Sequence, residues 1–321
     1  MKKFLKVLLG IVIVLGLFWG VVNIAPTYKV TDNNPWRKND NVLISAHRGG
    51  ADLNPENTKM AFDYVIKETS YTDIVEIDLM LTADNYLVIN HDKTLNKLAL
   101  PEGSPDVTVA TSTYKELSEY NLGRNFVARD LSHPYENYTI EQAKENGLTI
   151  MLFDDFLKEY KECRDIRLFV EIKEPKERCE DAVDAFETIV AKEENAWWDE
   201  RIMMISLTAK AIEYSLEKYP NRYVGALGFG MAPQLVGSLL CLDSLFKSKY
   251  QCIQTSMITK AGPIEINCAT KRFVNSAHKR NQSVVYWTIN EEDDMRFLIE
   301  LGTDIITTDC PDVLAKVIGK I

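Results

Sequence analysis

The sequence contains few cysteines, and none of them lies in a CxxC pair or in a cluster with histidine. Structural zinc sites are built from such closely spaced ligands, so their absence argues against a zinc site. One or two disulfides remain open if the chain enters an oxidising compartment, because spacing alone does not pair cysteines. We expect a mostly free, buried set, namely Cys163, Cys179, Cys241, Cys252, Cys268 and Cys310.

The sequence also lacks an excess of positive charge. Its 37 lysines and arginines are outnumbered by 47 aspartates and glutamates, which gives a formal net charge of -10. A nucleic-acid-binding protein normally carries a basic face for the phosphate backbone, so we predict no nucleic-acid partner. The acidic balance suits a divalent-cation site, and it leaves the oligomeric state open.

Low-complexity tracts and obvious internal repeats are absent from the 321 residues, which argues against a disordered or repeat protein. The chain is 46% hydrophobic and 26% charged, as is usual for a globular protein with a sizeable core. Barrels of about 250 residues commonly form one domain, so a single large domain is compatible with this length.

Long apolar runs are missing except at the amino terminus, where residues 4–24 meet the length of about 20 residues needed to span a bilayer. A cleaved signal peptide is the main alternative. Such peptides usually end in small residues, whereas here Ala25 is followed at once by Pro26, which is a poor cleavage junction. We therefore predict an uncleaved transmembrane anchor.

The flanks of this run predict its orientation. Lys2 and Lys3 precede it, Lys6 lies in its first turn, and the next lysine is Lys29. The positive-inside bias then places residues 1–3 in the cytoplasm, the anchor at 4–24, a polar linker at 25–41 and the domain at 42–321 outside the cytoplasm. The expected location is a single-pass membrane protein with an extracytoplasmic catalytic domain.

Short β-rich runs alternate with segments of helical spacing throughout the domain. Such alternation is typical of βα units around a parallel sheet, and about eight units over this length favour a TIM (β/α)8 barrel over an open doubly wound sheet. We expect strands at residues 42–46, 74–80, 87–90, 168–172, 202–207, 223–227, 253–257, 284–289 and 304–307, with helices at 58–69, 179–194, 209–218, 271–280 and 291–301.

One stretch interrupts this alternation. Residues 98–147 are polar and rich in turn-forming residues, and they follow the third expected strand. Because structureless loops of this length are uncommon inside a compact domain, we predict a small insertion that covers or shapes the mouth of the active site.

Charged residues lie at the ends of four expected strands. Residues two apart in a strand project to the same face, so Glu76 with Asp78, and Glu171 with Lys173, can point into one barrel mouth. Active sites of TIM barrels lie at the carboxyl ends of their strands. His47-Arg48 follows the first strand and His91 follows the third, which adds two histidines and a second cation.

Three converging carboxylates repel each other unless a cation lies between them, and oxygen ligands favour Mg²⁺ or Ca²⁺. Such a metal would polarise a phosphoryl oxygen, while Arg48 and Lys173 would neutralise phosphate charge. His47 and His91, two of only four histidines, could move the two protons of a phosphodiester cleavage. Each residue alone has an ordinary structural explanation, so the prediction depends on their occurring together.

The sequence resembles the glycerophosphodiester phosphodiesterase family from about residue 43 to residue 316. The matching motifs occur in the order and spacing of that family. They are His47-Arg48-Gly49, Pro55-Glu56-Asn57-Thr58, Glu76-Ile77-Asp78, His91-Asp92, Thr94-Leu95, Glu171-Ile172-Lys173, Trp287-Thr288-Ile289-Asn290, Gly302-Thr303-Asp304 and Thr308-Asp309 through Pro311.

The resemblance implies a TIM barrel with an insertion after the third strand, and hydrolysis of a glycerophosphodiester to an alcohol and glycerol 3-phosphate. In the implied route the glycerol 2-hydroxyl attacks phosphorus, and water then opens the cyclic phosphate. The implied roles are metal ligation by Glu76, Asp78 and Glu171, acid/base catalysis by His47 and His91, phosphate contact by Arg48 and Lys173, support of the mouth or metal by Glu56 and Asn57, and glycerol contact by Trp287, for which plain barrel packing is an alternative.

Other functions remain open from the sequence. A lysophospholipase D-like enzyme of lipid metabolism would take acylated substrates such as lysophospholipids from the membrane, and it would need apolar surface beside the mouth, for which residues 126–127 and 231–242 are candidates. A non-catalytic barrel would have lost a histidine or carboxylate, and none is missing. A carbohydrate hydrolase would not need the two histidines and two cations, and chelation would spare it.

Overall fold

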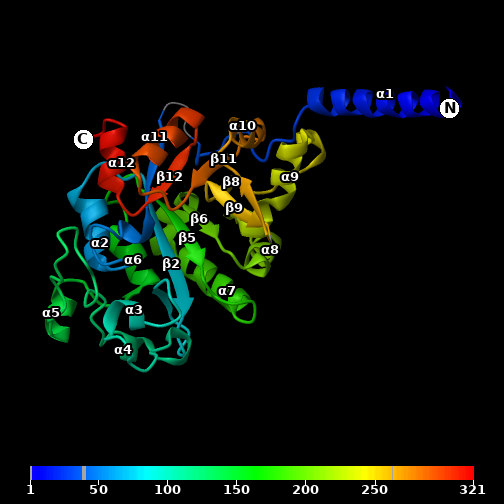
Figure 1. Ribbon diagram of the computed structural model, residues 1–321. Coiled ribbons are helices and arrows are strands. Elements are labelled where there is room, and N and C mark those ends of the chain that lie inside the picture. The colour runs from blue at the N-terminus through cyan, green and yellow to red at the C-terminus, as the bar shows by residue number, and fades with distance from the viewer. Residues whose placement is uncertain (1, 38–40, 262) are drawn as a thin grey trace.

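Eight strands close into a parallel barrel at the centre of the protein (Figure 1). The computed structural model describes residues 2–37, 41–261 and 263–321. The hydrogen-bonded order is β1-β12-β11-β8-β7-β6-β5-β2, and pairing of β1 with β2 closes the ring, which confirms the predicted TIM barrel. The strands are β1 (Leu43–Ala46), β2 (Ile74–Leu81), β5 (Arg167–Ile172), β6 (Ile202–Ile205), β7 (Tyr223–Leu227), β8 (Cys252–Thr255), β11 (Ser283–Tyr286) and β12 (Ile305–Thr308).

The barrel strands are short runs of apolar residues because both of their faces are covered. Every residue of β2, including Glu76 and Asp78, is buried, as is every residue of β1. Strands buried on both faces favour continuous aliphatic sequence, which is why each expected range overlaps an observed strand. The carboxylates on β2 are therefore exceptions that need a compensating positive charge.

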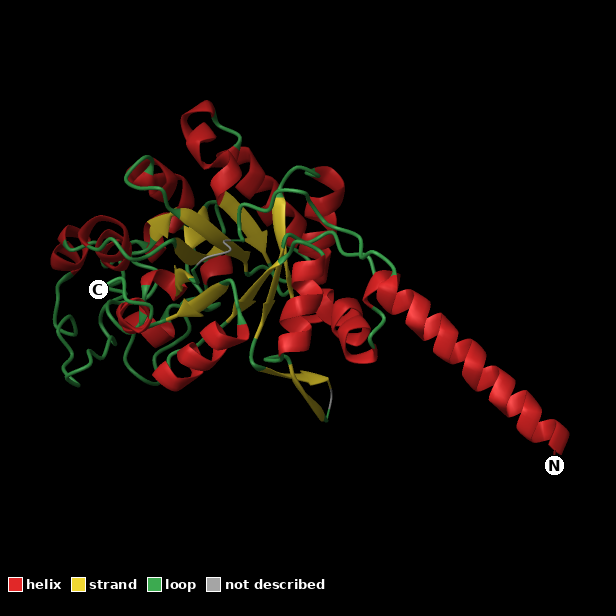
Figure 2. Cartoon of the chain, turned by 90° about the horizontal axis from the view of Figure 1, so that it is seen from above, coloured by secondary structure: helices red, strands yellow, loops and turns green. Residues whose placement is uncertain are grey.

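Helices surround the barrel, as the view from above shows (Figure 2). The five expected helices are present, although residues 58–69 divide into α2 and the π-helical turn η2. Helices α6, α9 and α12 were not expected from the sequence. The main outer helices are α2 (Lys59–Asp63), η2 (Tyr64–Glu68), α6 (Phe153–Tyr160), α7 (Cys179–Val190), α8 (Ala209–Lys218), α9 (Ala232–Leu240), α10 (Lys271–Lys279), α11 (Glu292–Leu301) and α12 (Pro311–Val317).

The third strand of the chain, β3 (Leu87–Ile89), does not belong to the parallel barrel. It pairs antiparallel with β2, with Leu79 opposite Ile89, and on its other side with β4 (Met151–Leu152). Only residues 82–86 separate β2 from β3, which is too short for the crossover that a parallel pair requires. Counting β3 as one of the barrel strands was wrong, and β5 is the third barrel strand.

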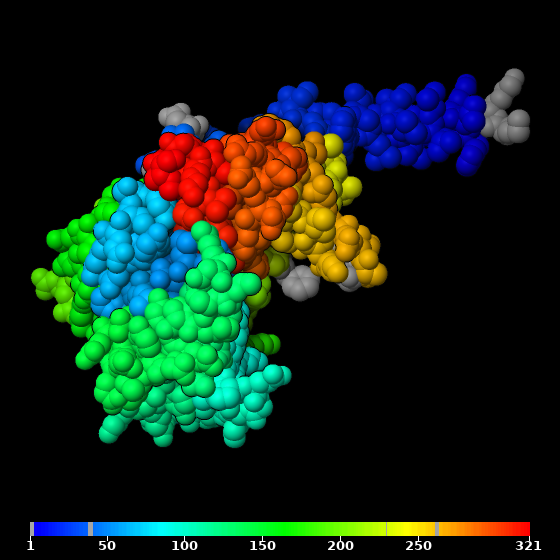
Figure 3. Space-filling view, turned by 60° about the vertical axis from the view of Figure 1, so that its left-hand side comes forward, coloured from blue at the N-terminus to red at the C-terminus, as the bar shows by residue number. Residues whose placement is uncertain are grey.

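The segment between β3 and β4 forms a small unit with its own core. Buried apolar residues from this segment pack with Met80 and Val88. Arg129 forms ion pairs with Asp52 and Asp312, which follow β1 and β12 respectively, so this insertion reaches the carboxyl end of the barrel. Figure 3 shows it in green against the blue and red segments. Its helices are α3 (Asn96–Ala99), η3 (Val109–Thr111), α4 (Tyr114–Leu117) and α5 (Ile140–Glu145).

The opposite, amino-terminal end of the barrel is closed by part of the expected linker. Trp36 is fully buried and stacks on Phe169 with ring centroids 5.3 Å apart. Asn34 donates hydrogen bonds to the backbone oxygens of Gln251 and Asn281, which precede β8 and β11. The segment was expected to be a linker because it is mostly polar, yet its one tryptophan, Trp36, fills the end of the barrel.

The amino-terminal helix α1 (Lys2–Ile24) extends away from the barrel (Figures 1 and 2). It is long and apolar enough to cross a membrane, and little of it is buried. Its last turns contact the end of α9 and the following turn η6 (Asp243–Leu245). The finding fits an anchor or a signal segment by length and composition.

Two further features complete the fold. A hairpin of β9 (Ile258–Ala261) and β10 (Ile264–Asn267) follows β8 and was not expected from the sequence. All six cysteines lie in the described part of the chain and are free thiols, as expected, but only three of them are buried, so the expectation of a mostly buried set holds for half.

Candidate active site

The first strand ends in a tight turn that presents His47 and Arg48 at the mouth of the barrel. Arg48, Gly49 and Gly50 all have positive φ values, of 52°, 81° and 89°. A Cβ on Gly49 would lie 2.9 Å from the Cβ of Ala61, so this position needs glycine for space as well as for conformation. The two glycines therefore allow the chain to turn sharply after β1 and leave the side chains of His47 and Arg48 at the mouth.

Three carboxylates meet beside this turn. Glu76 and Asp78 lie on β2, and Asp78 is paired in register with Glu171 on β5. One oxygen from each of the three lies within 4.8 Å of the others. Asp78 Oδ1 is buried without a hydrogen-bond partner among the described residues, although Lys173 Nζ lies 3.7 Å away. A set of three oxygen donors with an unsatisfied atom suits a hard divalent cation.

Burial makes this cluster costly without a cation. Burial, together with the charges of Asp78 and Glu171, raises the pKa of Glu76 well above its usual value. Burial also raises the pKa of Glu171, although the nearby Lys173 opposes that change. The protein thus holds three carboxylates close together where their ionisation is unfavourable. A bound cation would balance their negative charge.

Two cations flank the carboxylates. The backbone N–H of Arg48 donates to Glu76 Oε2 at 3.0 Å, and its guanidinium donates to Glu56 Oε1 at 2.8 Å. Lys173 Nζ lies 3.1 Å from Glu171 Oε1. Although burial acts in the opposite direction, the acidic neighbours raise the pKa of both cations, so each stays charged. Both side chains can therefore offer positive charge to an anionic substrate.

Each of the two histidines is held by an aspartate through its Nδ1 atom. His47 Nδ1 lies 2.6 Å from Asp309 Oδ1, and Asn290 donates to the other oxygen of Asp309 at 2.8 Å. His91 Nδ1 lies 2.8 Å from Asp92 Oδ1. Burial opposes the change, but the hydrogen bond from His47 lowers the pKa of Asp309, while His91 lowers that of Asp92. Both imidazoles are thereby oriented for proton transfer at Nε2.

These groups surround a small pocket of about 110 Å³. Seven of the eight predicted site residues line it, and the eighth, Asp78, lies in the buried carboxylate cluster beside it. The structure thus brings the eight predicted residues together from five separate strand ends, those of β1, β2, β3, β5 and β11. The lining residues are His47, Arg48, Glu76, His91, Glu171, Lys173, Ile205, Leu207, Leu227, Gln254, Trp287 and Thr307.

Comparison with known families agrees with this geometry. Residues 47–313 match the model of the glycerophosphoryl diester phosphodiesterase family, a range that extends from the turn after β1 into α12. The chain belongs to this family. Membership confirms the predicted resemblance and the expected enzyme class, a phosphoric diester hydrolase.

Several relatives align over most of the family member's length. A glycerophosphodiester phosphodiesterase from Caldanaerobacter subterraneus is 26% identical, with 87% of this chain and 98% of that protein covered. One from Bacillus altitudinis is 24% identical, with 85% and 97% covered. Lysophospholipase D GDPD3 from Mus musculus is 21% identical, with 87% and 82% covered. The comparisons therefore include proteins named as glycerophosphodiester phosphodiesterases and one named as a lysophospholipase D.

Solved structures share the fold. The glycerophosphoryl diester phosphodiesterase domain of a Mycobacterium tuberculosis protein superposes with a TM-score of 0.70 at 17% identity, with 88% of this chain and all of that chain covered. A phosphodiesterase from Oleispira antarctica, in complex with its product sn-glycerol-3-phosphate, superposes with a TM-score of 0.63 at 18% identity, with 86% and 96% covered. At these identities the likeness supports the barrel fold.

The residues that orient the two histidines were not predicted from the sequence. Asp309 and Asn290 occur in quoted motifs of this phosphodiesterase family, yet nothing in the sequence places them beside His47. The available signal was the position of Asp309 directly after the last barrel strand, where a carboxylate reaches the same mouth. Gln254 and Thr307, which also line the pocket, were missed because each resembles an ordinary polar residue at a strand end.

The two residues predicted to support the mouth or the metal, Glu56 and Asn57, both contact site residues. Glu56 accepts hydrogen bonds from Arg48 and from Lys97, at 2.8 and 2.9 Å. Asn57 is fully buried and donates to Asp78 Oδ2 at 2.9 Å. These contacts fix the orientation of one cation and one carboxylate, in agreement with the supporting role expected of them.

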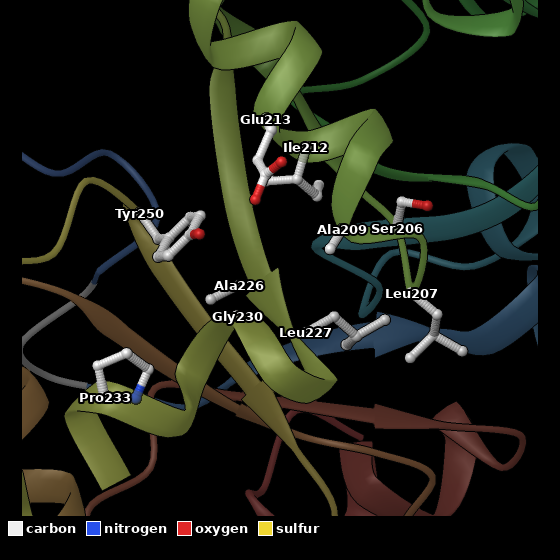
Figure 4. Close-up of a pocket in the computed structure, with 10 residues that line it drawn as sticks. All are labelled: Ser206, Leu207, Ala209, Ile212, Glu213, Ala226, Leu227, Gly230, Pro233 and Tyr250. Carbon is white, nitrogen blue, oxygen red and sulfur yellow. The ribbon is translucent and has the colours of Figure 1, made fainter. Parts of the chain in front are cut away.

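A second cavity of about 310 Å³ adjoins the catalytic pocket, and the two share Leu207 and Leu227 (Figure 4). Ile212 and Ala226 add apolar surface. Figure 4 shows the carboxylate of Glu213 directed toward this space. The cavity lies between α8 and the segment that leads to α9, so it offers apolar volume directly beside the reacting centre.

Proposed function

We propose that this chain hydrolyses glycerophosphodiesters to an alcohol and glycerol 3-phosphate at the site described above. The observation that carries the proposal is the convergence of Glu76, Asp78 and Glu171 with two cations and two aspartate-oriented histidines around one pocket. Names of full-length relatives and the product complex of a structural neighbour support the same substrate class.

We propose that Glu76, Asp78 and Glu171 hold a divalent cation, Mg²⁺ or Ca²⁺. When bound, the cation would supply Lewis-acid polarisation of a phosphoryl oxygen and would acidify a hydroxyl group beside it. Arg48 and Lys173, which flank the carboxylates, would contact the remaining phosphate oxygens. Together these positive charges would match the charge that develops on phosphorus-bound oxygen during cleavage.

His47 and His91 are proposed as the general acid/base pair. One would accept the proton of the attacking glycerol 2-hydroxyl while its oxygen bonds to phosphorus. The other would donate a proton to the head-group oxygen as its bond to phosphorus breaks, which releases the alcohol. Water would then open the cyclic phosphate with the proton transfers reversed. Asp309 and Asp92, hydrogen-bonded to Nδ1 of the two rings, would stabilise the protonated imidazoles.

The test is release of glycerol 3-phosphate from sn-glycero-3-phosphocholine by the purified full chain, with Mg²⁺ or Ca²⁺ and with a chelator. We expect chelation to abolish the activity and His47→Ala or Glu76→Ala to remove it from a folded protein. His278→Ala is the matched control, because His278 is also held by an aspartate, Asp304, at 2.8 Å but lies outside the pocket. Wild-type rates in both site variants would refute the proposed mechanism.

A second candidate substrate class is acylated, such as a lysophospholipid. The cavity beside Leu207 and Leu227 favours it, because the apolar part of its lining would accept an acyl chain close to the phosphate site. One relative is named a lysophospholipase D. The two classes share the same phosphodiester chemistry and differ in what lies beyond the glycerol, so a panel of head groups and acylated forms distinguishes them.

We also propose that α1 is an uncleaved membrane anchor that places the barrel outside the cytoplasm. Support comes from its length and apolar composition and from the exposure of its residues. Lysines at its amino-terminal end favour a cytoplasmic start. Intact mass of the membrane-extracted protein tests retention of the segment, and protease access to the barrel in sealed cells tests its side.

A further inference from the structure

Helix α9 and the turn η6 expose an unusual number of apolar side chains. We call this set the α9–η6 surface. The other face of α9 is buried against the barrel, with Leu235 only 6% exposed. A surface helix normally presents polar residues to water, so this outward apolar face calls for a partner. Its members are Val236, Leu239, Leu240 and Leu245, which are 44%, 54%, 56% and 52% exposed.

The α9–η6 surface lies directly beside the end of α1. The indole N–H of Trp19 donates to the backbone oxygen of Leu240 at 3.4 Å, and Ser244 donates to the backbone oxygen of Val22 at 2.7 Å. Val22 is buried by this contact, whereas the preceding Val21 is 67% exposed. In Figure 1 the blue helix meets the yellow segment at this point. The two apolar surfaces are therefore continuous.

This contact fixes the depth of the surface if α1 spans a bilayer. Trp19 lies five residues before Ile24, which is about 7 Å along the helix axis at a rise of about 1.5 Å per residue. A span of 4–24 fills a hydrocarbon core of about 30 Å, so Trp19 and Leu240 lie just inside its boundary. Tryptophan is enriched at the membrane–water interface. An interfacial helix buries its apolar face to a depth of about 5–10 Å at the same boundary.

Positive charge next to the α9–η6 surface is also consistent with a position at the membrane interface. Lys247 and Lys249 are exposed and follow Leu245 by two and four residues. Lipid phosphates attract such juxtamembrane lysines, whereas the chain as a whole carries a net charge of -10. An apolar face bordered by lysines is the composition of an element that lies in a membrane interface.

We propose that the α9–η6 surface enters the leaflet that receives the carboxyl-terminal end of α1, as a second membrane contact. This inference rests on the anchoring role proposed above for α1. Helix α9 runs from the carboxyl end of β7 toward the amino-terminal start of β8, so η6 lies at the barrel end that Trp36 closes. The catalytic mouth is at the opposite end and faces away from the bilayer, so the substrate enters from the aqueous phase.

The mouth has exposed apolar residues of its own, which define the competing orientation. Val127, 49% exposed, precedes Arg129, which contacts Asp52 and Asp312 at the carboxyl end of the barrel. Ile264, 62% exposed, lies on the β9–β10 hairpin. In Figures 1 and 3 the insertion and α1 lie at opposite sides of the molecule. Membrane contact through these residues would turn the mouth toward the bilayer.

Depth-dependent fluorescence quenching separates the two orientations. The full chain, with the accessible Cys163, Cys241 and Cys310 replaced by serine, is reconstituted in vesicles of phosphatidylcholine and phosphatidylglycerol that carry a quencher on the acyl chain. A fluorophore is attached at one introduced cysteine. Leu245→Cys reports on the α9–η6 surface, and Val127→Cys, of similar exposure, is the matched control at the mouth.

We expect strong quenching at position 245 and little at position 127. Val12→Cys, in the middle of α1, reports on the anchor itself. Quenching at 12 without quenching at 245 overturns the second contact and leaves the anchor intact. Quenching at position 127 overturns the proposed orientation. Absence of quenching at position 12 overturns both the anchor and the second membrane contact. Release of glycerol 3-phosphate is measured separately in the same vesicles and does not depend on this contact. Loss of the proposed activity is therefore distinguishable from loss of the contact.

Substitutions that place negative charge on the α9–η6 surface provide a second test. Leu239→Asp combined with Leu240→Asp should remove most of the quenching of a fluorophore at Lys247→Cys while the chain stays in the vesicle through α1. The matched substitution Val127→Asp should leave that quenching unchanged. Because the three changed positions are exposed, the barrel should stay folded by circular dichroism. Unchanged quenching in the double variant would overturn the inference.

Discussion

At the scale of single residues, the pairing of His47 with Asp309 is the contact that most directly prepares the site for proton transfer. The 2.6 Å hydrogen bond occupies Nδ1 and leaves Nε2 as the nitrogen that would act on substrate in the proposed mechanism. Asn290 restrains the same carboxylate. In the proposed mechanism Asp309 is therefore a positioning residue that holds the ring of His47 through Nδ1.

We expect Asp309→Asn to lower kcat by about 10- to 100-fold, the usual effect of losing such an orienting partner, with a smaller change in KM. The pH profile of kcat should shift, because asparagine cannot stabilise the charged ring of His47. Steady-state kinetics across pH measure both effects. Asp312→Asn, which changes a pair with Arg129 outside the pocket, should leave the profile in place. An unaltered kcat in Asp309→Asn would remove the positioning role.

The carboxylate cluster predicts a link between pH, metal and stability. Burial, with Asp78 and Glu171, raises the pKa of Glu76, so the folded protein binds this proton more tightly than the unfolded chain does. Without metal, the contribution of this group to stability therefore falls as pH rises from the ordinary value through the raised one. A cation between the carboxylates offsets their repulsion once they are ionised.

Added Mg²⁺ or Ca²⁺ should accordingly raise Tm more at about pH 8 than at about pH 5. Differential scanning fluorimetry of the full chain at both pH values, with and without the ion, measures the two increments. Glu76→Gln removes the titrating group and should bring the increments closer together. Equal increments in the unaltered protein would show that these carboxylates do not bind the ion.

At the scale of elements, the amino-terminal end of the barrel depends on a residue from outside the strands. Trp36 fills that end against Phe169 and packs edge-on to Tyr223 at 6.2 Å. The strands supply walls, and a segment that precedes them supplies the plug. The barrel therefore begins structurally before β1, within the segment that composition alone marks as a linker.

Trp36→Ala should destabilise the barrel by about 3–5 kcal/mol, the range for removing a buried large aromatic side chain. A chain that begins at Pro26 should keep full stability in urea, whereas one that begins at Asn41 should show a similar loss. Trp197→Ala, which changes a partly exposed tryptophan on the outer surface, is the control and should cost less. Equal unfolding midpoints for the two truncations would contradict the role of Trp36.

At the scale of the whole molecule, the helix α1 is separated in space from the mouth of the barrel and from the insertion beside that mouth. The mouth lies at the carboxyl ends of the strands, and α1 joins the body near the other end. An anchored enzyme of this shape meets substrates that are dissolved at a distance from the bilayer more readily than lipids still embedded in it. Acylated substrates would have to leave the bilayer before their acyl chain reached the cavity beside Leu207.

Leu207 offers a test of that cavity, because it is 58% exposed and lines both pockets. Leu207→Asp should reduce hydrolysis of a lysophosphatidylcholine by about tenfold or more, the effect of a charge on acyl-chain contact. Hydrolysis of sn-glycero-3-phosphocholine should fall less, because this substrate has no acyl chain to contact Leu207. Leu207→Met is the matched control and should preserve both rates. Equal losses on both substrates would show that the cavity does not accommodate acyl chains.

Most of the barrel and the composition of its pocket follow from the sequence. Strands buried on both faces appear as unbroken apolar runs, so each barrel strand could be predicted from local sequence alone. Burial of carboxylates and cations at the ends of those runs costs free energy, so these residues stand out in the sequence. Their spacing along β2 and β5 predicted that they share one face of the sheet. The amino-terminal apolar run was equally plain.

Tertiary structure decided the rest, because the deciding contacts join residues that are far apart in the chain. His47 and Asp309 are separated by 262 positions, and Trp19 and Leu240 by 221. The antiparallel pairing of β3 depended on the short connection to β2, and the place of Trp36 depended on the open end of a closed barrel. Local patterns report burial, whereas only the folded chain shows which buried or exposed groups meet.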